Sequence, residues 1–325
     1  MKNLYADFCL PDSVCEACQS KAMQRIQKID MNCGLNYTRF PVFSSMEPYT
    51  RYEHSVGVAA LIYHFTQDEI QSLAGLFHDI STPVFSHVVD FMKGDHMVQE
   101  TTESPTVSFI QNDPAIMEIL SRRSIQLDQV SDYHQYPIAD NDSPKLSCDR
   151  LEYTLGNMVN YGFVQSDTVT AFLQDLRIGQ NEEGIKELQF QNPETALYFA
   201  ELALRCGKIY SGEEDRYAME TLALLLKKAV QKGILFETDL YTTEEQVILK
   251  LEHSDLKKEW QQFCGLYKIT EGSPEDGLNI NAKRRYIDPY IQNQGRVSDV
   301  YYTFRIKAEE FVSESYDKWL KGISI

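Results

Sequence analysis

Four side chains of this sequence are best suited to chemistry: His54, the adjacent pair His78-Asp79, and Asp149. Two imidazoles and two carboxylates can hold one divalent metal ion and leave coordination positions open, so that the ion can activate water. This mixed nitrogen and oxygen set suits manganese, iron, magnesium, cobalt, nickel or zinc, and the residue types do not choose among these metals. Any one of the four has a simpler explanation, because a buried histidine is usually hydrogen-bonded in the core and an aspartate often begins a helix. The four residues together predict a metal site.

The elements that must position these residues are predicted to be helices. Apolar residues recur at helical spacing over residues 53–65, 68–78 and 149–159. His78 and Asp79 end the second of these helices, and although adjacent helical side chains diverge by about 100°, both can reach an ion beyond the helix terminus. Since His54 comes from the preceding helix and Asp149 from a later one, the site is expected where three helices meet.

The rest of the chain also has mostly helical patterns. Pro114 begins one further helix, and helical spacing predicts others over residues 20–29, 85–92, 167–176, 193–206, 216–232, 243–252 and 255–267. Residues 126–146 are polar and contain two prolines, which predicts a loop. Residues 300–304 are β-branched and aromatic, which predicts a short strand or hairpin. The predicted fold is therefore an all-α domain over residues 1–270 and a small mixed α/β C-terminal subdomain over residues 271–325.

Composition is that of a soluble globular protein. The 325 residues are 43% hydrophobic and 24% charged, and no apolar run is long enough to cross a membrane. The N-terminus lacks a basic segment followed by an apolar one, so we expect no signal peptide and a cytoplasmic protein. The formal net charge of -17 argues against an extended nucleic-acid surface. A small anionic substrate is compatible with this charge if a local cationic pocket receives it.

The seven cysteines, with no secretion signal, predict reduced thiols rather than a disulfide framework. Cys15 and Cys18 have the Cys-x-x-Cys spacing of zinc sites, with Cys9 nearby and Cys33 as the one plausible fourth ligand. A second close pair of cysteines or histidines is missing. Buried or inert thiols are therefore the simpler explanation, and a structural zinc stays open.

The sequence motifs around the metal-site residues resemble those of the HD-domain metal-dependent phosphohydrolases. Within that family they resemble most the branch of deoxynucleoside triphosphate triphosphohydrolases. The matching words are Arg51-x-x-His54-Ser55-x-Gly57-Val58, Leu73 to Asp79, Phe85-Ser86-His87 and Asp149-Arg150-Leu151-Glu152-Tyr153. The similarity covers about residues 20–255, and a weaker similarity is found at residues 283–289. It implies the HD-domain helical fold, hydrolysis of a small phosphorylated, nucleotide-like substrate, and a homo-oligomer.

The resemblance also implies roles at the metal centre. The ligands of one divalent metal ion would be His54, His78, Asp79 and Asp149. The catalytic residues would be His87, Asp90 and His96, the last of which would face the phosphates. His87 and Asp90 lie on one face of a predicted helix. A histidine oriented by a carboxylate can transfer protons near neutral pH.

The side chains expected to contact the substrate are also identified by the family resemblance. The resemblance implies contacts to phosphate or sugar from Arg51, Arg150, Tyr153, Asn157 and Tyr210. Each also has a simpler interpretation. Arg51 could form an ion pair at the surface, and the two tyrosines could be packing residues.

Two departures from the family pattern bear on the substrate. Thr82 stands where the triphosphohydrolases usually have the histidine of a Gly-His-Gly word, and Gly156-Asn157 replaces an Arg-Asp pair. We also find no match for the arginine that holds the triphosphate tail. A triphosphate needs several cationic contacts, so these losses favour hydrolysis of a phosphoester over release of triphosphate.

The leading prediction is a metal-dependent phosphohydrolase that cleaves a phosphoester or phosphoanhydride of a nucleotide-like substrate. One alternative is a nucleotidase or phosphodiesterase on the same metal centre, which the identity of the product would distinguish. Another is a non-catalytic nucleotide sensor that keeps the fold and the metal and binds its ligand through Tyr153 and Tyr210. The altered residues Thr82 and Asn157 are its support.

Overall fold

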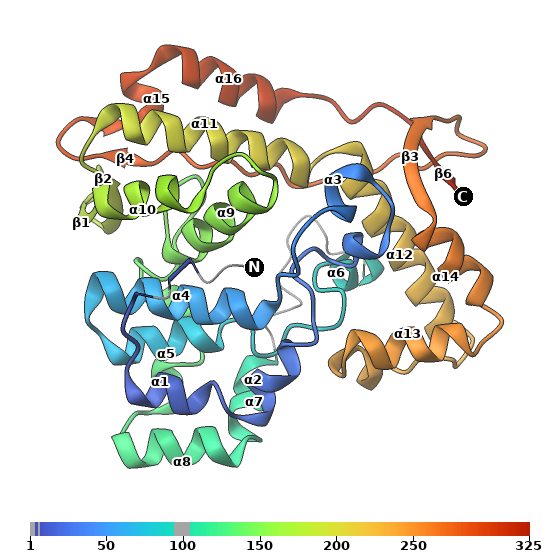
Figure 1. Cartoon of the computed structure of the whole chain (residues 1–325), viewed down its shortest axis with the longest axis horizontal. Helices are drawn as coiled ribbons and strands as arrows, with labels where there is room; N and C mark the ends of the chain where they lie inside the picture. Colours follow the sequence, from blue (N-terminus) through green and yellow to red (C-terminus); the bar gives the residue numbers. More distant parts are fainter. Residues whose placement is uncertain (1–3, 6, 94–104) are drawn as a thin grey trace.

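Helices form most of the chain, as the sequence predicts (Figure 1). A computed structural model describes residues 4, 5, 7–93 and 105–325. The α-helices are α1 Asp12–Ala17, α2 Lys21–Ile26, α3 Pro41–Ser44, α4 Arg51–Thr66, α5 Glu69–Phe77, α6 Val88–Lys93, α7 Thr106–Gln111, α8 Pro114–Arg123, α9 Cys148–Asn160, α10 Ser166–Asp175, α11 Pro193–Tyr210, α12 Glu213–Gln231, α13 Glu244–Glu252, α14 Lys257–Cys264, α15 Val297–Val300 and α16 Tyr302–Ser313. Short 3-10 turns are η1 Leu35–Tyr37, η2 Leu127–Gln129, η3 Tyr133–Gln135 and η4 Glu237–Tyr241. The strands are β1 Leu176–Gln180, β2 Lys186–Phe190, β3 Leu266–Glu271, β4 Tyr290–Ile291, β5 Gly295–Arg296 and β6 Leu320–Ser324.

Two adjacent helices, α4 and α5, carry much of the candidate site. Thr50 begins α4 with a capping box: its side chain accepts from the Glu53 N–H, and the Glu53 carboxylate accepts from the Thr50 N–H. The Asp68 carboxylate accepts from the N–H groups of Ile70 and Gln71 at the start of α5. Local hydrogen bonds therefore fix both starts, close to where the sequence predicts them.

The helix α9 follows the predicted loop and lies between α4 and α11 (Figure 1). The Ser147 hydroxyl caps α9 by accepting from the Arg150 N–H at 3.2 Å. Apolar side chains of the three helices share one hydrophobic core, in which Leu61, Leu151 and Phe199 are fully buried. This packing holds the starts of α4 and α9 close together.

Two small sheets lie toward opposite sides of the view in Figure 1, the one with β1 and β2 at the left and the one with β3 and β6 at the right, near the C-terminus. In the first, β1 and β2 form an antiparallel hairpin, β4 runs parallel to β2, and β5 is antiparallel to β4. In the second, β3 pairs antiparallel with β6. Between these sheets, α16 runs beside α11 (Figure 1). Strands from both sides of residue 270 thus share sheets, and the division into two domains stays a prediction.

The C-terminal segment corrects one prediction from the sequence. Residues 300–304 do not form a strand: most of them belong to α15 and α16. Phe304, Ala308 and Phe311 recur at helical spacing and are buried in the core shared with α11. Burial of this apolar stripe outweighs the β propensity of the Val-Tyr-Tyr-Thr-Phe run. The hairpin of β1 and β2 was also not predicted.

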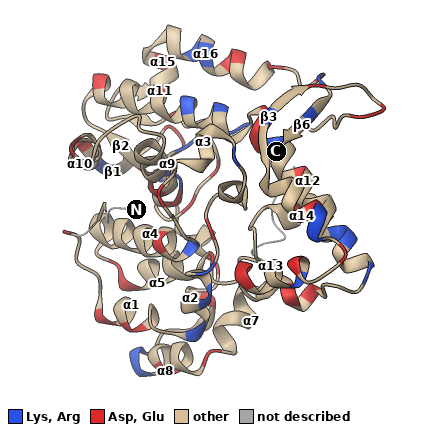
Figure 2. Ribbon diagram, turned by 45° about the vertical axis from the view of Figure 1, so that its right-hand side comes forward, with Lys and Arg blue, Asp and Glu red and all other residues tan. Residues whose placement is uncertain are grey.

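No helix within the described residues combines the length and apolar character that crossing a membrane requires. Basic residues lie on helices far from one another, such as α8, α14 and α16 (Figure 2). The predictions of a cytoplasmic protein without an extended nucleic-acid surface rest on the sequence and stay predictions.

Candidate metal centre

Three of the four predicted ligands meet where α4, α5 and α9 converge. His54 lies in the first turn of α4, His78 is the C-cap of α5, and Asp149 lies in the first turn of α9. The His54 Nε2 atom is 3.1 Å from His78 Nε2 and 3.0 Å from Asp149 Oδ1. The distance from His78 Nε2 to Asp149 Oδ1 is 3.7 Å. Because two nitrogens and one oxygen point at a common centre, this triad fits a divalent metal ion.

Both imidazoles are oriented by a hydrogen bond on the opposite side of the ring. His78 Nδ1 lies 2.7 Å from the Gly75 carbonyl oxygen, which makes Nδ1–H the donor. His54 Nδ1 lies 2.5 Å from Glu152 Oε2. Each contact leaves Nε2 directed at the triad centre, which is the arrangement that metal-binding histidines use.

Glu152 is a site residue that the sequence analysis did not single out. It is buried beneath His54, and its Oε2 also accepts from the Tyr49 hydroxyl. A Cβ at Gly57 would lie 2.5 Å from Glu152 Oε1, so the glycine allows the carboxylate to approach α4. The spacing from Asp149 to Glu152, one helical turn, is the signal that would have found it.

Asp79 borders the triad. Its Oδ2 lies 3.5 Å from His78 Nε2 and 3.9 Å from His54 Nε2. The same oxygen pairs with Arg51 Nη1 at 2.9 Å, and Oδ1 accepts from the Thr82 hydroxyl at 2.7 Å. The group of mutually close ligand atoms contains His54, His78 and Asp149. The role of Asp79 as a fourth ligand therefore stays a prediction.

Electrostatics keep the two aspartates charged. Burial by itself would raise the pKa of Asp79, but the charges of Arg51 and the two histidines outweigh it and hold that pKa well below its usual range. Asp149 is held low in the same way, mainly by the hydrogen bond with His54. Burial would lower the pKa of His54, yet Asp149 and Glu152 raise it to about 10. A metal ion bound at His54 Nε2 would take the place of a proton on that nitrogen.

Arg51 lies inside the site rather than at the surface. Only 5% of the residue is exposed. Its Nη1 pairs with Asp79, and its Nε donates to the Ser86 hydroxyl at 3.0 Å. The cation therefore stands beside the triad, where the sequence places it.

Arg150 makes contacts of a different kind. Its Nη1 pairs with Asp140 Oδ1 at 3.1 Å, and its Nε donates to the Lys145 carbonyl oxygen at 2.8 Å. Its Nη2 donates to the carbonyl and side-chain oxygens of Asn141. The guanidinium thus holds the loop before α9, and its contact with a substrate stays a prediction.

His87 and Asp90 form the expected pair. His87 Nδ1 lies 3.0 Å from Asp90 Oδ2, and the side chains are 28% and 0% exposed. Burial lowers the pKa of His87, and the charges of Arg51 and Arg285 act in the same direction against the hydrogen bond to Asp90. A neutral imidazole with an accessible edge can accept a proton at neutral pH. The third predicted catalytic residue, His96, lies outside the described residues.

Three tyrosines, Tyr153, Tyr210 and Tyr161, form an uncharged aromatic wall that begins beside His54. The ring of Tyr153 is 6.4 Å from that of His54 and 6.2 Å from that of Tyr210, and Tyr161 lies 6.4 Å from Tyr210. Asn157 donates from Nδ2 to the Tyr210 hydroxyl at 2.8 Å. Its buried Oδ1 has no hydrogen-bond partner among the described residues. Three predicted substrate contacts, Tyr153, Asn157 and Tyr210, are therefore brought together beside the triad.

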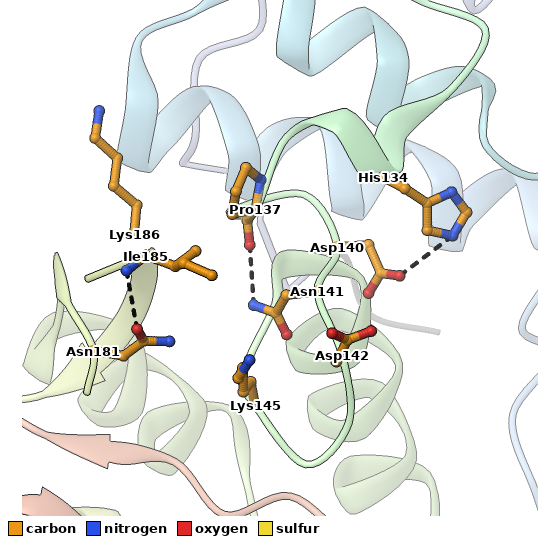
Figure 3. A pocket seen from close by; sticks show the side chains of 9 residues that line it. All are labelled: His134, Pro137, Asp140, Asn141, Asp142, Lys145, Asn181, Ile185 and Lys186. Carbon is orange, nitrogen blue, oxygen red and sulfur yellow. Dashed lines mark hydrogen bonds and ion pairs between the residues drawn. The ribbon is translucent and has the colours of Figure 1, made fainter. Parts of the chain in front are cut away.

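A separate cavity of about 230 Å³ adjoins the loop before α9. Figure 3 shows the residues that line it: His134, Pro137, Asp140, Asn141, Asp142, Lys145, Asn181, Ile185 and Lys186. None of the triad residues lines this cavity. One of its walls is the Asp140 and Asn141 stretch that binds Arg150.

The strand β2 and the C-terminal residues 288–296 fix the same loop from the other side. Glu187 is fully buried and accepts from the Leu146 N–H at 3.0 Å. Arg296 binds both Glu187 oxygens, at 2.6 and 2.8 Å, and the Asp288 N–H donates to the Pro144 carbonyl oxygen at 2.9 Å. These contacts hold the loop before α9 and thereby help to place α9 and Asp149.

The N-terminal thiols do not join a metal-ligand group within the described residues. Cys9 and Cys15 are exposed and Cys18 is buried, all with free thiols. The one group of close metal-ligand atoms found in the described part of the chain is the triad.

Comparison with known proteins finds two distant relatives and no matching family model. The uncharacterised protein YdhJ of Bacillus subtilis is 26% identical over 287 residues, which cover 85% of this chain and 84% of the relative. The metal-dependent phosphohydrolase cns2 of Cordyceps militaris is 25% identical over 293 residues, which cover 86% of this chain and 80% of the relative. Both likenesses extend over most of the chain.

Proposed function

We propose that this chain is an HD-type metal-dependent phosphohydrolase. The observation that carries the proposal is the convergence of His54, His78 and Asp149, with both imidazoles oriented from behind. The name of the relative from Cordyceps militaris, a metal-dependent phosphohydrolase, supports the same class. The proposal includes the resemblance to the triphosphohydrolase branch. It also includes the homo-oligomer that this resemblance implies.

The triad, with Asp79 as a fourth ligand, would hold one divalent ion, which supplies Lewis-acid activation of water and of a phosphoryl oxygen. Arg51 would offset negative charge on the phosphoryl group next to Asp79. The imidazole of His87 would accept a proton and pass it to the leaving oxygen, while Asp90 fixes the orientation of the ring. Glu152 would keep His54 Nε2 directed at the ion.

The organic part of the substrate would lie along the aromatic wall. Tyr153 and Tyr210 offer ring faces and edges for a nucleoside, and the buried Asn157 Oδ1 offers an acceptor for a hydroxyl or amino group. These neutral groups support a nucleotide-like substrate.

A non-catalytic nucleotide sensor is the second candidate. It is favoured by one observation, the hydrogen bonds that keep Arg150 on the loop before α9. A sensor would bind nucleotide along the same wall and release no product.

The test is turnover by purified protein that has been stripped of metal and reloaded with manganese, iron, magnesium, cobalt, nickel or zinc in turn. A panel of nucleotides is offered, and phosphate, pyrophosphate and tripolyphosphate are separated. Asp149→Asn should abolish release, whereas His253→Ala, a change at the exposed end of α13, should leave it unchanged. Tight nucleotide binding with no product under any metal would establish the sensor instead.

A further inference from the structure

Resting on the proposed function, we infer that Ser86 is a positioning residue, whose hydroxyl orients the Arg51 guanidinium toward the phosphoryl group. Of the motif Phe85-Ser86-His87, the proposed reaction uses only His87. Three features support a role for Ser86: the left-handed backbone of the residue, its complete burial, and the two hydrogen bonds of its hydroxyl group.

The backbone of Phe85 and Ser86 is held in an unusual conformation. Their φ angles are 57° and 50°, in the left-handed region that residues with a side chain rarely adopt. Two such residues in succession cost conformational energy, which the surrounding structure must offset. Backbone strain of this kind is concentrated at active sites and at turns that hold ligands. The strain therefore points to a function for this turn beyond packing.

Packing and a hydrogen bond hold the turn in place. The fully buried Phe85 side chain lies in a core with side chains of α12, α13 and α14, and its ring centre is 6.2 Å from that of Trp260. A Cβ at Gly34 would lie 3.0 Å from the Phe85 ring, so the glycine leaves room for this ring. The Ser86 N–H donates to the Pro83 carbonyl oxygen at 3.0 Å. The position of Ser86 is therefore set by its neighbours on both sides in the chain.

The Ser86 hydroxyl connects Arg51 to the main chain before α4. Its Oγ accepts from Arg51 Nε at 3.0 Å, and its O–H donates to the Asp30 carbonyl oxygen at 3.4 Å. Asp30 is fixed in turn, because its N–H donates to Glu244 Oε1 at 3.0 Å. The hydroxyl is thus both donor and acceptor, and the main chain of Asp30 helps to direct its free electron pairs at Arg51.

The contact with Ser86 determines which part of the Arg51 guanidinium can meet a substrate. Ser86 uses Nε, and Asp79 uses Nη1 at 2.9 Å. No further hydrogen bond of this guanidinium is found among the described residues, which leaves Nη2 for a phosphoryl oxygen. Because a guanidinium is a rigid planar fork, fixing two of its nitrogens fixes the direction of the third. With Asp79 alone as its partner, the group can swing about a single contact.

The same turn begins the helix that follows His87. The Val88 N–H donates to the Phe85 carbonyl oxygen and the Val89 N–H donates to the Ser86 carbonyl oxygen, each at 3.1 Å. The start of α6 is therefore built on the turn, and His87 is the residue between them. One strained turn thus helps to place both the cation and the imidazole that the proposed reaction requires.

The experiment compares Ser86→Ala and Ser86→Gly with the parent, as metal-loaded full chains and with the nucleotide that the parent cleaves fastest. Both variants lack the hydroxyl, but only glycine also relieves the left-handed backbone. We expect kcat to fall at least about tenfold in both, the effect of one lost hydrogen bond to a charged group. KM and the dissociation constant of the metal should stay within about twofold, because the contact acts on the transition state. Ser86→Gly should unfold at a higher temperature than Ser86→Ala.

Two further variants supply the control and the route. Ser124 is an exposed serine at the end of α8 with a φ angle of 57°, so Ser124→Gly relieves the same backbone conformation and should leave kcat unchanged. Arg51→Lys removes the Nε–H group that Ser86 accepts. In this background Ser86→Ala should lower kcat by less than about twofold, since coupled residues are not additive. Fully additive losses would show that Ser86 does not act through Arg51.

Unchanged kcat in both Ser86 variants would overturn the positioning role. So would a return to the parent's kcat in Ser86→Gly, because activity would then depend on backbone strain and not on the hydroxyl. If the parent binds metal but cleaves no nucleotide, the proposed function fails and the role of Ser86 fails with it. If the parent is active and the Ser86 variants match it, only the role of Ser86 fails.

Discussion

Glu152 is predicted to set the metal affinity of the site through His54. The Glu152→Gln change keeps the size of the side chain but removes the negative charge that lies 2.5 Å from His54 Nδ1. The imidazole then becomes a weaker ligand, and the amide can also present its N–H₂ group to the ring. Groups that hydrogen-bond to a metal-binding histidine contribute roughly 10- to 100-fold to metal affinity, or about 1.4–2.7 kcal/mol.

The fold should survive this change. Burial raises the pKa of Glu152, against the hydrogen bonds from His54 and Tyr49, so the native carboxylate already carries a cost of burial. A neutral amide avoids that cost, and the free energy of unfolding of the metal-free chain should change by less than about 2 kcal/mol. Loss of affinity without loss of stability separates orientation of His54 from simple unfolding.

The assay is calorimetric titration of manganese or zinc into metal-free protein, paired with urea unfolding. Glu252→Gln makes the same chemical change at an exposed position of α13 and should leave the dissociation constant unaltered. A Glu152→Gln protein that binds metal within about twofold of the parent, well below the expected range, would refute the reasoning.

Three further changes have defined outcomes. Arg296→Met should lower the free energy of unfolding by about 3–5 kcal/mol, because it leaves the fully buried Glu187 without its cation; urea unfolding measures it, and adding Glu187→Gln should recover part of the loss. Burial raises the pKa of Glu244 to about 7 and that of Asp30 to about 6, so these acids bind protons more tightly when folded and their contribution to stability falls as pH rises toward 7. Between pH 5 and 8, Glu244→Gln should therefore lose less stability than the parent, and parallel pH profiles would contradict this. Gly57→Ala would ordinarily favour a helix by about 1 kcal/mol, but here the Cβ meets Glu152 Oε1, so both metal affinity and stability should fall; an unchanged affinity by the same titration would count against the close approach.

Helix periodicity explains what the sequence could predict. The elements that carry His54, His78 and Asp149 have long apolar stripes and clear caps, and each begins within two residues of its predicted start. The spacing of His87 and Asp90 also predicted that they lie on one face of a helix, and the two side chains form a pair there. Tyr153 and Tyr210 were expected at the substrate only from the family resemblance, and they meet because α9 packs directly on α11.

Long-range contacts explain what the sequence could not predict. Arg150 binds a loop whose course depends on Glu187 and Arg296, which lie 109 positions apart. No local sequence pattern predicts a contact between residues so far apart in the chain. The hairpin of β1 and β2 lacks regular alternation and pairs with β4 much later in the chain. In residues 300–304 local β propensity pointed to a strand, whereas burial against α11 favours a helix.

Metal-dependent phosphate release is the most direct test of the central claim that His54, His78 and Asp149 hold a catalytic divalent ion. Metal-free protein is titrated with the metal that gives the highest turnover, and inorganic phosphate is followed for the parent and for Asp149→Asn. We expect release to saturate at one ion per parent chain and to be absent from the variant at the same metal concentration. Equal release by both proteins, or release by the parent that survives complete removal of metal, would contradict the account.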